Sequence, residues 1–305
     1  MKALDEFVHK LNHYLPVDFN DEENNEYRQY LIDTYLENCT NEKYQFALLA
    51  FHMLFMSFLY KEFWSLKTFS FETVSDLCRN NAKYGGVINV FDASIIPELT
   101  AIDDFLSILN FHRNKKDAVK EFVKKRDQCA HASGFIQFRK DSIERYLCDV
   151  LEYSEKISSA NKRNIIKIFF SDFENYIQSE IFQTSLSGEY IKNKIFSGKY
   201  SLKDIEYILE APMPEIIVND ELGDYKIAYF FAMLVLQTFY ENHVIYYSEP
   251  LDRNDYTNKL YLFLETLSKE QYEKIQVQTE DELNYLKSLE CPLNLSTINE
   301  FVERV

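Results

Sequence analysis

Apolar residues in this chain recur mainly at helical spacing. The most apolar segment, residues 46–60 (FALLAFHMLFMSFLY), is interrupted only by His52 and Ser57 and is bounded by Lys43 and by Lys61-Glu62. A helix that is apolar on all sides at this length is too short to cross a bilayer comfortably and is typical of a buried core helix. A second apolar stretch, residues 227–236 with a continuation to residue 247, predicts another core helix.

Boundary signals and periodicity predict further helices. Pro97 opens a helical segment over 98–109, Asn114 can cap one over 115–130, and residues 142–154 carry apolar side chains at i, i+3 and i+4. Other helical patterns cover residues 161–183, 190–196, 202–210, 225–247, 255–277 and 295–304. The segments 215–218 and 244–247 are short and β-prone, so any sheet would be small.

The scarcity of turn-forming residues supports an all-α fold. The 305 residues include only 6 glycines and 6 prolines, the residues on which tight turns and hairpins depend. The polar stretch Ser158–Asn161 predicts a domain boundary. We therefore expect an N-terminal helical arm over 1–39, a helical domain over 40–157, and a second, mainly helical domain over 158–305 that regulates the first or binds a partner.

Charge is distributed unevenly along the chain. The net charge is −16, which argues against a protein whose whole surface is drawn onto nucleic acid or an anionic membrane. Residues 112–140, however, carry 9 basic and 3 acidic side chains, a local charge of +6. The acidic N-terminus is unlike a secretory signal, so we expect a cytoplasmic protein without a membrane partner. Five scattered cysteines without CxxC spacing indicate neither a disulfide framework nor a zinc site.

Arg126 and His131, within the basic stretch, are the candidates for chemistry. A guanidinium grips phosphate with a planar fork, and an imidazole exchanges a proton near neutral pH. Cleavage of RNA without a metal needs a base for the 2′-OH proton, an acid for the 5′-oxygen, and positive charge beside the phosphorane. Five residues along a helix turn the two side chains about 140° apart, so the helix must end nearby, as at Gly134, or a second copy must complete the site.

These residues resemble the motif of the HEPN superfamily, helical domains whose ribonuclease members carry Arg-x4–6-His with a polar residue after the arginine. Here the motif reads Arg126-Asp127-x3-His131. The apolar helix over 46–60 is similar to the long first helix of that fold. The resemblance implies a dimeric, metal-independent endoribonuclease in which Arg126 stabilises the phosphate, His131 is general base or acid, and Asp127 orients one of them. It also implies a toxin or antiviral role.

RNA would be held along its backbone by nearby basic side chains, and no cofactor is expected. The candidate RNA-binding residues are Lys124, Lys125, Arg139 and Lys140. His52 could act as a second proton carrier, although a lone histidine on an apolar helix is more often a core residue. A metal site lacks further ligands beside Cys129 and His131, and no phosphate-binding or dinucleotide-binding glycine motif is present.

Two other interpretations stay open. In the first, the chain is a non-catalytic helical binding or oligomerisation module. Arg126 is then paired with an acid from the acidic C-terminal half, and His131 is a helix C-cap. In the second, residues 161–305 regulate the enzyme, and their acidic surface covers the basic site until a trigger removes it.

Overall fold

The computed structural model is built from α-helices. It describes residues 2–19, 22–69, 71–80, 82–131, 138–183, 186–212, 223–243, 258–260, 262, 264–271, 273–275 and 277. The elements are α1 (Lys2–Asn12), α2 (Glu22–Thr40), α3 (Tyr44–Phe69), α4 (Phe71–Asn80), α5 (Ala82–Gly85), the 3₁₀ helix η1 (Val90–Ile95), α6 (Glu98–Ile108), α7 (Arg113–Ala130), α8 (Lys140–Ile177), α9 (Ser187–Ser197), α10 (Leu202–Glu210) and α11 (Gly223–His243). No strand is formed by these residues, which confirms the all-α prediction. The β-prone segments 215–218 and 244–247 and the pattern over 295–304 lie outside the described residues.

The chain divides into two compact units. Unit 1 comprises residues 1–164 and 198–203, and unit 2 comprises residues 165–197 and 204–305. The stretch Ser158–Asn161 does not end a helix, because α8 continues through it to Ile177. The predicted separate arm over 1–39 also differs from the structure: Val8, Leu11 and Tyr35 are buried in the core of unit 1.

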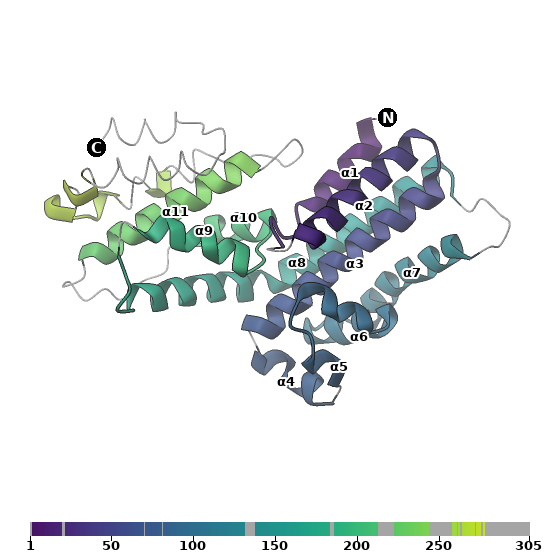
Figure 1. Ribbon diagram of the computed structural model, residues 1–305, viewed down its shortest axis with the longest axis horizontal. Helices are drawn as coiled ribbons and strands as arrows, with labels where there is room; N and C mark the ends of the chain where they lie inside the picture. The colour runs from purple at the N-terminus through teal and green to yellow at the C-terminus, as the bar shows by residue number, and fades with distance from the viewer. Residues whose placement is uncertain are drawn as a thin grey trace. The chain divides into compact units, whose positions relative to one another are not determined.

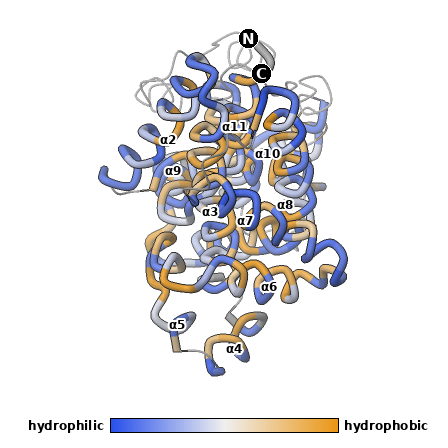
Figure 2. Tube along the Cα trace, turned by 90° about the vertical axis from the view of Figure 1, so that its right-hand side faces the viewer, coloured by the Kyte–Doolittle hydropathy of each residue, from blue (hydrophilic) through white to orange (hydrophobic). Residues whose placement is uncertain are grey.

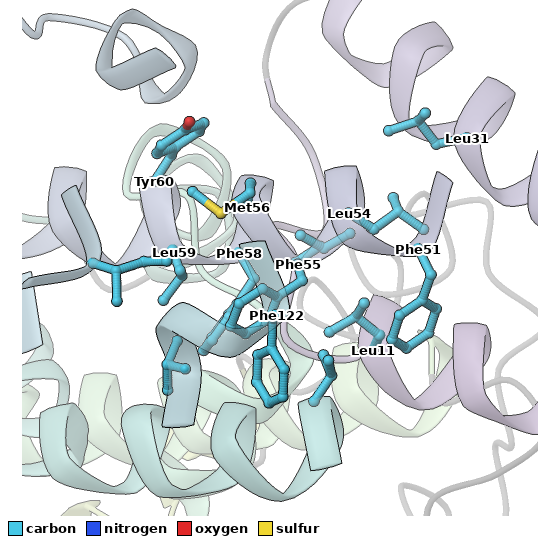
Figure 3. Close-up of a cluster of buried hydrophobic side chains, with 14 of the residues drawn as sticks. Leu11, Leu31, Phe51, Leu54, Phe55, Met56, Phe58, Leu59, Tyr60 and Phe122 are labelled. Atoms are coloured by element: carbon cyan, nitrogen blue, oxygen red, sulfur yellow. The ribbon is translucent and has the colours of Figure 1, made fainter. Parts of the chain in front are cut away.

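Helix α3 forms the centre of unit 1. Helix α2 packs along it, and α1 lies beside both (Figure 1). The ring of Phe55 meets those of Phe58 at 6.2 Å and Phe122 at 5.6 Å between centroids. In Figure 3 these rings lie on one side of α3, and Tyr60 projects from the other. The apolar segment over 46–60 is therefore a core helix, as predicted.

Helix α3 continues to Phe69, beyond its predicted end, and two charged residues are buried within it. The pattern predicts that Lys61 and Glu62 bound the apolar segment, yet both are almost fully buried. Lys61 Nζ donates to Glu62 Oε1 at 2.9 Å, and Asn161 Nδ2 donates to Glu62 Oε2 at 2.8 Å. This α8 residue supplies the hydrogen bond that a buried carboxylate requires.

By length and composition, residues Tyr44–Thr68 of α3 could cross a membrane. Of the 18-residue window that meets this criterion, 83% is buried inside the structure, and a single such helix is weak evidence for a membrane span.

The helices that carry the candidate site begin and end close to their predicted positions. Pro97 stands at the N-cap of α6, as predicted. Helix α7 begins at Arg113, with His112 rather than Asn114 at its N-cap, and it ends at Ala130. Asn114 instead accepts a hydrogen bond from the backbone N–H of Lys115 at 2.9 Å. The tube in Figure 2 changes repeatedly between hydrophobic and hydrophilic positions, as expected where one face of a helix is buried.

Unit 2 has its own aromatic core. Helix α11 packs on α9, and most of its residues from Tyr225 to Tyr240 are buried. The rings of Tyr176 and Tyr190 stack at 3.9 Å between centroids. The predicted helix over 202–210 coincides with α10.

Replacing Phe55 by Ala should destabilise unit 1 by about 3–5 kcal/mol, because the substitution removes a fully buried ring and leaves a cavity. The single tryptophan, Trp64 on α3, lets fluorescence in urea follow the unfolding of this unit. The matched control is Phe46→Ala on the same helix, where the ring is 56% exposed and the loss should stay within about 0.5 kcal/mol. Equal losses in the two variants would contradict the burial of Phe55 in the core of unit 1.

Candidate functional site

Arg126 forms ion pairs with two carboxylates, those of Glu98 and Asp127. It lies in the last part of α7, and its guanidinium faces the first turn of α6. Nη2 donates to Glu98 Oε2, and Nη1 lies 3.0 Å from Asp127 Oδ1. The Arg126 side chain is 28% exposed, so this pair is only partly screened by water. The orientation of the guanidinium is therefore fixed by residues of two helices.

Glu98 also binds His52, which links α6 and α7 to the core helix. His52 is buried on α3, and its Nε2 lies 3.1 Å from the same Oε2 of Glu98. Its Nδ1 lies 3.0 Å from the hydroxyl of Tyr146 on α8. A neutral imidazole satisfies both contacts when Nε2–H donates to Glu98 and Nδ1 accepts from Tyr146. His52 is thus a satisfied core histidine that also holds Glu98.

The charges of this network support one another. Partial burial raises the pKa of Glu98, but the hydrogen bonds from His52 and Arg126 and the charge of Arg126 outweigh it and lower the pKa overall. Burial lowers the pKa of Arg126, and the contacts with Glu98 and Asp127 raise it overall. Both groups are therefore ionised at neutral pH.

His131 lies at the end of α7, outside the ion pairs that hold the guanidinium of Arg126. It is the C-cap of the helix, with φ −80° and ψ 140°, and its backbone N–H donates to Asp127 O at 3.1 Å. Its side chain belongs to an exposed residue. No hydrogen bond or ion pair joins His131 to Arg126 in the described part of the chain. The structure thus brings Arg126 and Asp127 together and leaves His131 open at the helix end; Gly134 lies outside the described residues.

The four candidate RNA-binding residues lie on or next to α7 and the start of α8. Lys124 is paired with Glu121 one turn away, Lys125 Nζ lies 4.0 Å from Asp149, and Lys140 Nζ lies 4.0 Å from Glu144. Arg139 is exposed and precedes α8. Exposed ion pairs of this kind are weak, so phosphate can replace the carboxylates.

Two further lysines of the basic stretch are paired with an acidic side chain of α6. Lys116 and Lys120 both bind Asp103 of α6, at 3.3 and 2.5 Å. The hydrogen bond from Lys120 is the largest influence on Asp103 and lowers its pKa. These two lysines therefore hold α7 against α6.

A cysteine nucleophile and a metal centre find little support. Cys129 is buried, and this burial raises the pKa of its thiol to about 11, which disfavours the thiolate. Across the described residues, no three His, Cys, Asp or Glu side chains are close enough together to hold a metal ion.

Glu98 is the site residue that the sequence did not indicate. It is separated from Arg126 by 28 residues and from His52 by 46, and nothing local marks it. The only sequence signal for Glu98 was its position directly after Pro97. Acidic residues are common there, in the first turn of a helix. The acid that the binding-module interpretation required was expected from the C-terminal half; this expectation was wrong, because Glu98 comes from the N-terminal half.

Replacing Glu98 by Gln should cost about 1–2 kcal/mol of unit 1 stability at pH 7, because Arg126 and His52 lose a charged hydrogen-bond partner. The folded-state pKa of Glu98 lies below its ordinary value of 4.5, so its contribution is complete above that value. The contribution disappears as the pH falls through the folded-state pKa. Urea unfolding of the two proteins, followed by Trp64 fluorescence, should therefore converge as the pH is lowered from 7 to 3.

The control for this prediction is Glu121→Gln, which removes an exposed ion pair with Lys124 on the same helix as Arg126. It should change stability by less than about 0.5 kcal/mol at any of these pH values. A difference between wild type and Glu98→Gln that does not depend on pH would argue against an ionic role for Glu98.

No known protein family, curated protein or solved structure matches this chain. The resemblance of Arg126-Asp127-x3-His131 to the HEPN motif therefore stays an expectation from the sequence.

Proposed function

We propose that unit 1 is a metal-independent endoribonuclease of the HEPN type, with Arg126 and His131 as its catalytic residues. The observation that carries the proposal is a guanidinium fixed by Glu98 and Asp127 on a helix whose C-cap is an exposed histidine. Fixed positive charge stabilises a phosphorane best because it needs no reorganisation during the reaction. An exposed imidazole near the same helix end can reach a bound RNA strand and exchange a proton.

The reaction assigns one task to each residue. The ribose 2′-oxygen attacks phosphorus and forms a new O–P bond, a base removes the 2′ proton, and the 5′-oxygen leaves with a proton from an acid. The products are a 2′,3′-cyclic phosphate and a 5′-hydroxyl. Arg126 keeps a second N–H on each Nη atom beyond those used by Glu98 and Asp127, and these can donate to the phosphorane oxygens. Asp127 orients the guanidinium.

A second proton-carrying group is needed, and a second copy of the chain would provide it. His52 is unsuitable, because it is buried and both of its nitrogens are engaged by Glu98 and Tyr146. Two chains related by a two-fold axis would contribute two copies of His131 and Arg126 to one phosphate. The proposal therefore includes a homodimer in the cytoplasm that acts as a toxin or antiviral effector, with unit 2 as the region that binds a regulatory partner.

One observation favours the non-catalytic alternative. The charge of Arg126 is already balanced by two carboxylates, as in a structural ion-pair network. In that case α7 would be a binding surface, and His131 would only terminate the helix. The two functions differ in whether His131 matters for RNA cleavage.

In the presence of EDTA, the purified protein should cleave total RNA and end-labelled oligonucleotides to products with cyclic-phosphate ends. His131→Ala should slow this cleavage by about 10²- to 10⁴-fold, the usual contribution of a general acid or base. Arg126→Lys keeps the charge but loses the planar fork and should also be strongly impaired. Controls on the same helix are His112→Ala and Arg113→Lys, both at exposed residues where the helix begins.

Equal activity of His131→Ala and His112→Ala would assign the cleavage to another site or a contaminant. A wild-type protein that binds RNA without cleaving it would favour the binding module. Circular dichroism of each variant separates loss of chemistry from loss of fold.

Binding of single-stranded RNA should depend on salt through the exposed lysines. In a His131→Ala background, replacing Lys124 and Lys140 by Ala should weaken binding and reduce the slope of log K against log salt by roughly 0.7 for each phosphate that is no longer neutralised. Fluorescence anisotropy across a range of KCl concentrations measures this slope. Lys116→Ala is the matched control, because Lys116 is bound to Asp103; an equal change there would place the RNA elsewhere.

A further inference from the structure

A groove opens beside the Glu98 network, on the face of α3 opposite the aromatic core. Its volume is about 590 Å³, which is sufficient for a ligand of nucleotide size. Helix α2 contributes Tyr27, α3 contributes Met56 and Tyr60, and the segment from η1 to α6 contributes Phe91, Ile95 and Glu98. Tyr60 projects from α3 away from Phe122 toward this side (Figure 3). All of these residues belong to unit 1.

The walls of the groove suit a flat apolar ring. Tyr27 and Phe91 meet edge to face at 5.8 Å between centroids, which holds both rings in place. Met56 and Ile95 add apolar surface, and Ile95 is 57% exposed at the rim. Burial raises the pKa of Tyr60 to about 12, so its hydroxyl stays protonated and uncharged. Aromatic side chains of this kind are common stacking partners of unpaired bases.

Glu98 gives the groove a single anionic acceptor. Its Oε2 is used by His52 and Arg126, whereas no described residue donates a hydrogen bond to Oε1. The carboxylate is ionised at neutral pH and its side chain is 25% exposed. An occupant should therefore combine a planar ring with adjacent N–H donors and should carry no acceptor facing this oxygen.

Among the RNA bases, guanine meets this requirement best. Its Watson–Crick edge presents N1–H and the N2 amino group side by side, and both can donate to the one open oxygen, Oε1. Adenine and cytosine place a ring nitrogen lone pair beside their amino group, and uracil flanks its single N–H with two carbonyl oxygens. Each of these three bases would turn at least one acceptor toward Glu98.

We propose that the groove binds an unpaired guanine of the RNA, which stacks on its aromatic walls and donates from N1 and N2 to Oε1 of Glu98. The inference rests on the proposed ribonuclease function, because it takes the ligand to be part of an RNA chain. The same carboxylate holds Arg126, so a guanine at Oε1 lies next to the guanidinium that contacts the phosphate. Glu98 is then a specificity-determining residue and also a positioning residue for Arg126.

The test measures nucleotide binding separately from cleavage. Isothermal titration calorimetry of the full-length His131→Ala protein compares GMP, IMP, which lacks the N2 amino group, and AMP. GMP should bind about 10-fold or more tightly than AMP, with IMP between them, because GMP offers Oε1 two N–H donors, IMP one, and AMP an acceptor beside its amino group. All three ligands carry one phosphate, so the differences report the base.

A matched pair of variants locates the binding. Ile95→Lys puts a competing cation in the groove and should abolish the preference for GMP. Ile88→Lys makes the same change at a residue that is 85% exposed and does not line the groove, and it should leave binding unchanged. Glu98 itself is not substituted, because it also holds Arg126.

Each outcome bears on one proposal. Equal affinity for GMP and AMP, or a GMP preference that survives Ile95→Lys, overturns the guanine site. If the wild type cleaves RNA through His131 without any preference for GMP, the guanine site fails and the ribonuclease stands. If GMP is preferred but the wild type cleaves no RNA, the ribonuclease fails instead. Capture of an apolar, arginine-containing peptide in place of GMP would identify the groove as a peptide site and also overturn the proposal.

Discussion

The contact on which unit 1 depends is the carboxylate of Glu98 between His52 and Arg126. His52 lies in the most apolar helix of the unit, where an unsatisfied imidazole would cost free energy. Glu98 satisfies Nε2, and the hydroxyl of Tyr146 satisfies Nδ1, so residues of α3, α6, α7 and α8 meet in one network. Removing Glu98 or the Tyr146 hydroxyl leaves one nitrogen of the buried His52 without its partner.

Under the proposed function, the same network gives Arg126 a structural role and a catalytic one. A guanidinium has five N–H donors, and the two carboxylates use only part of this capacity. The ion pairs that restrict its rotation also pre-organise it for a phosphate, so the cost of orienting it is met during folding. The pairing is thus compatible with either function, and what separates the two functions is whether the exposed imidazole of His131 takes part in RNA cleavage.

Local signals predicted the helices well and long-range contacts poorly. Periodicity and boundary residues were enough for α10, for the Pro97 start of α6 and for the end of α7, because these depend on neighbours in sequence. The charge of Lys61 predicts an end to the core helix, and the polarity of Ser158–Asn161 predicts a break. Both stretches are nevertheless helical, and they contact each other: Asn161 donates to Glu62, which lies 99 residues away in the sequence, so the buried carboxylate has a partner. Charge alone cannot indicate burial when the compensating partner is that distant.

In the candidate site, too, local contacts could be predicted from the sequence and long-range contacts could not. Arg126 and Asp127 are adjacent, so their pairing was foreseeable, whereas Glu98 and His52 reach the site only through the packing of three helices. This packing places His52 and Arg126 on the same oxygen of Glu98, Oε2, and the proposed guanine site uses the other. Under that proposal, a substitution at Glu98 changes stability, arginine orientation and base recognition together. The role of the groove can be separated from that of the fold only at the rim of the groove. Ile95 lies there and takes no part in the hydrogen bonds of His52, Glu98 and Arg126.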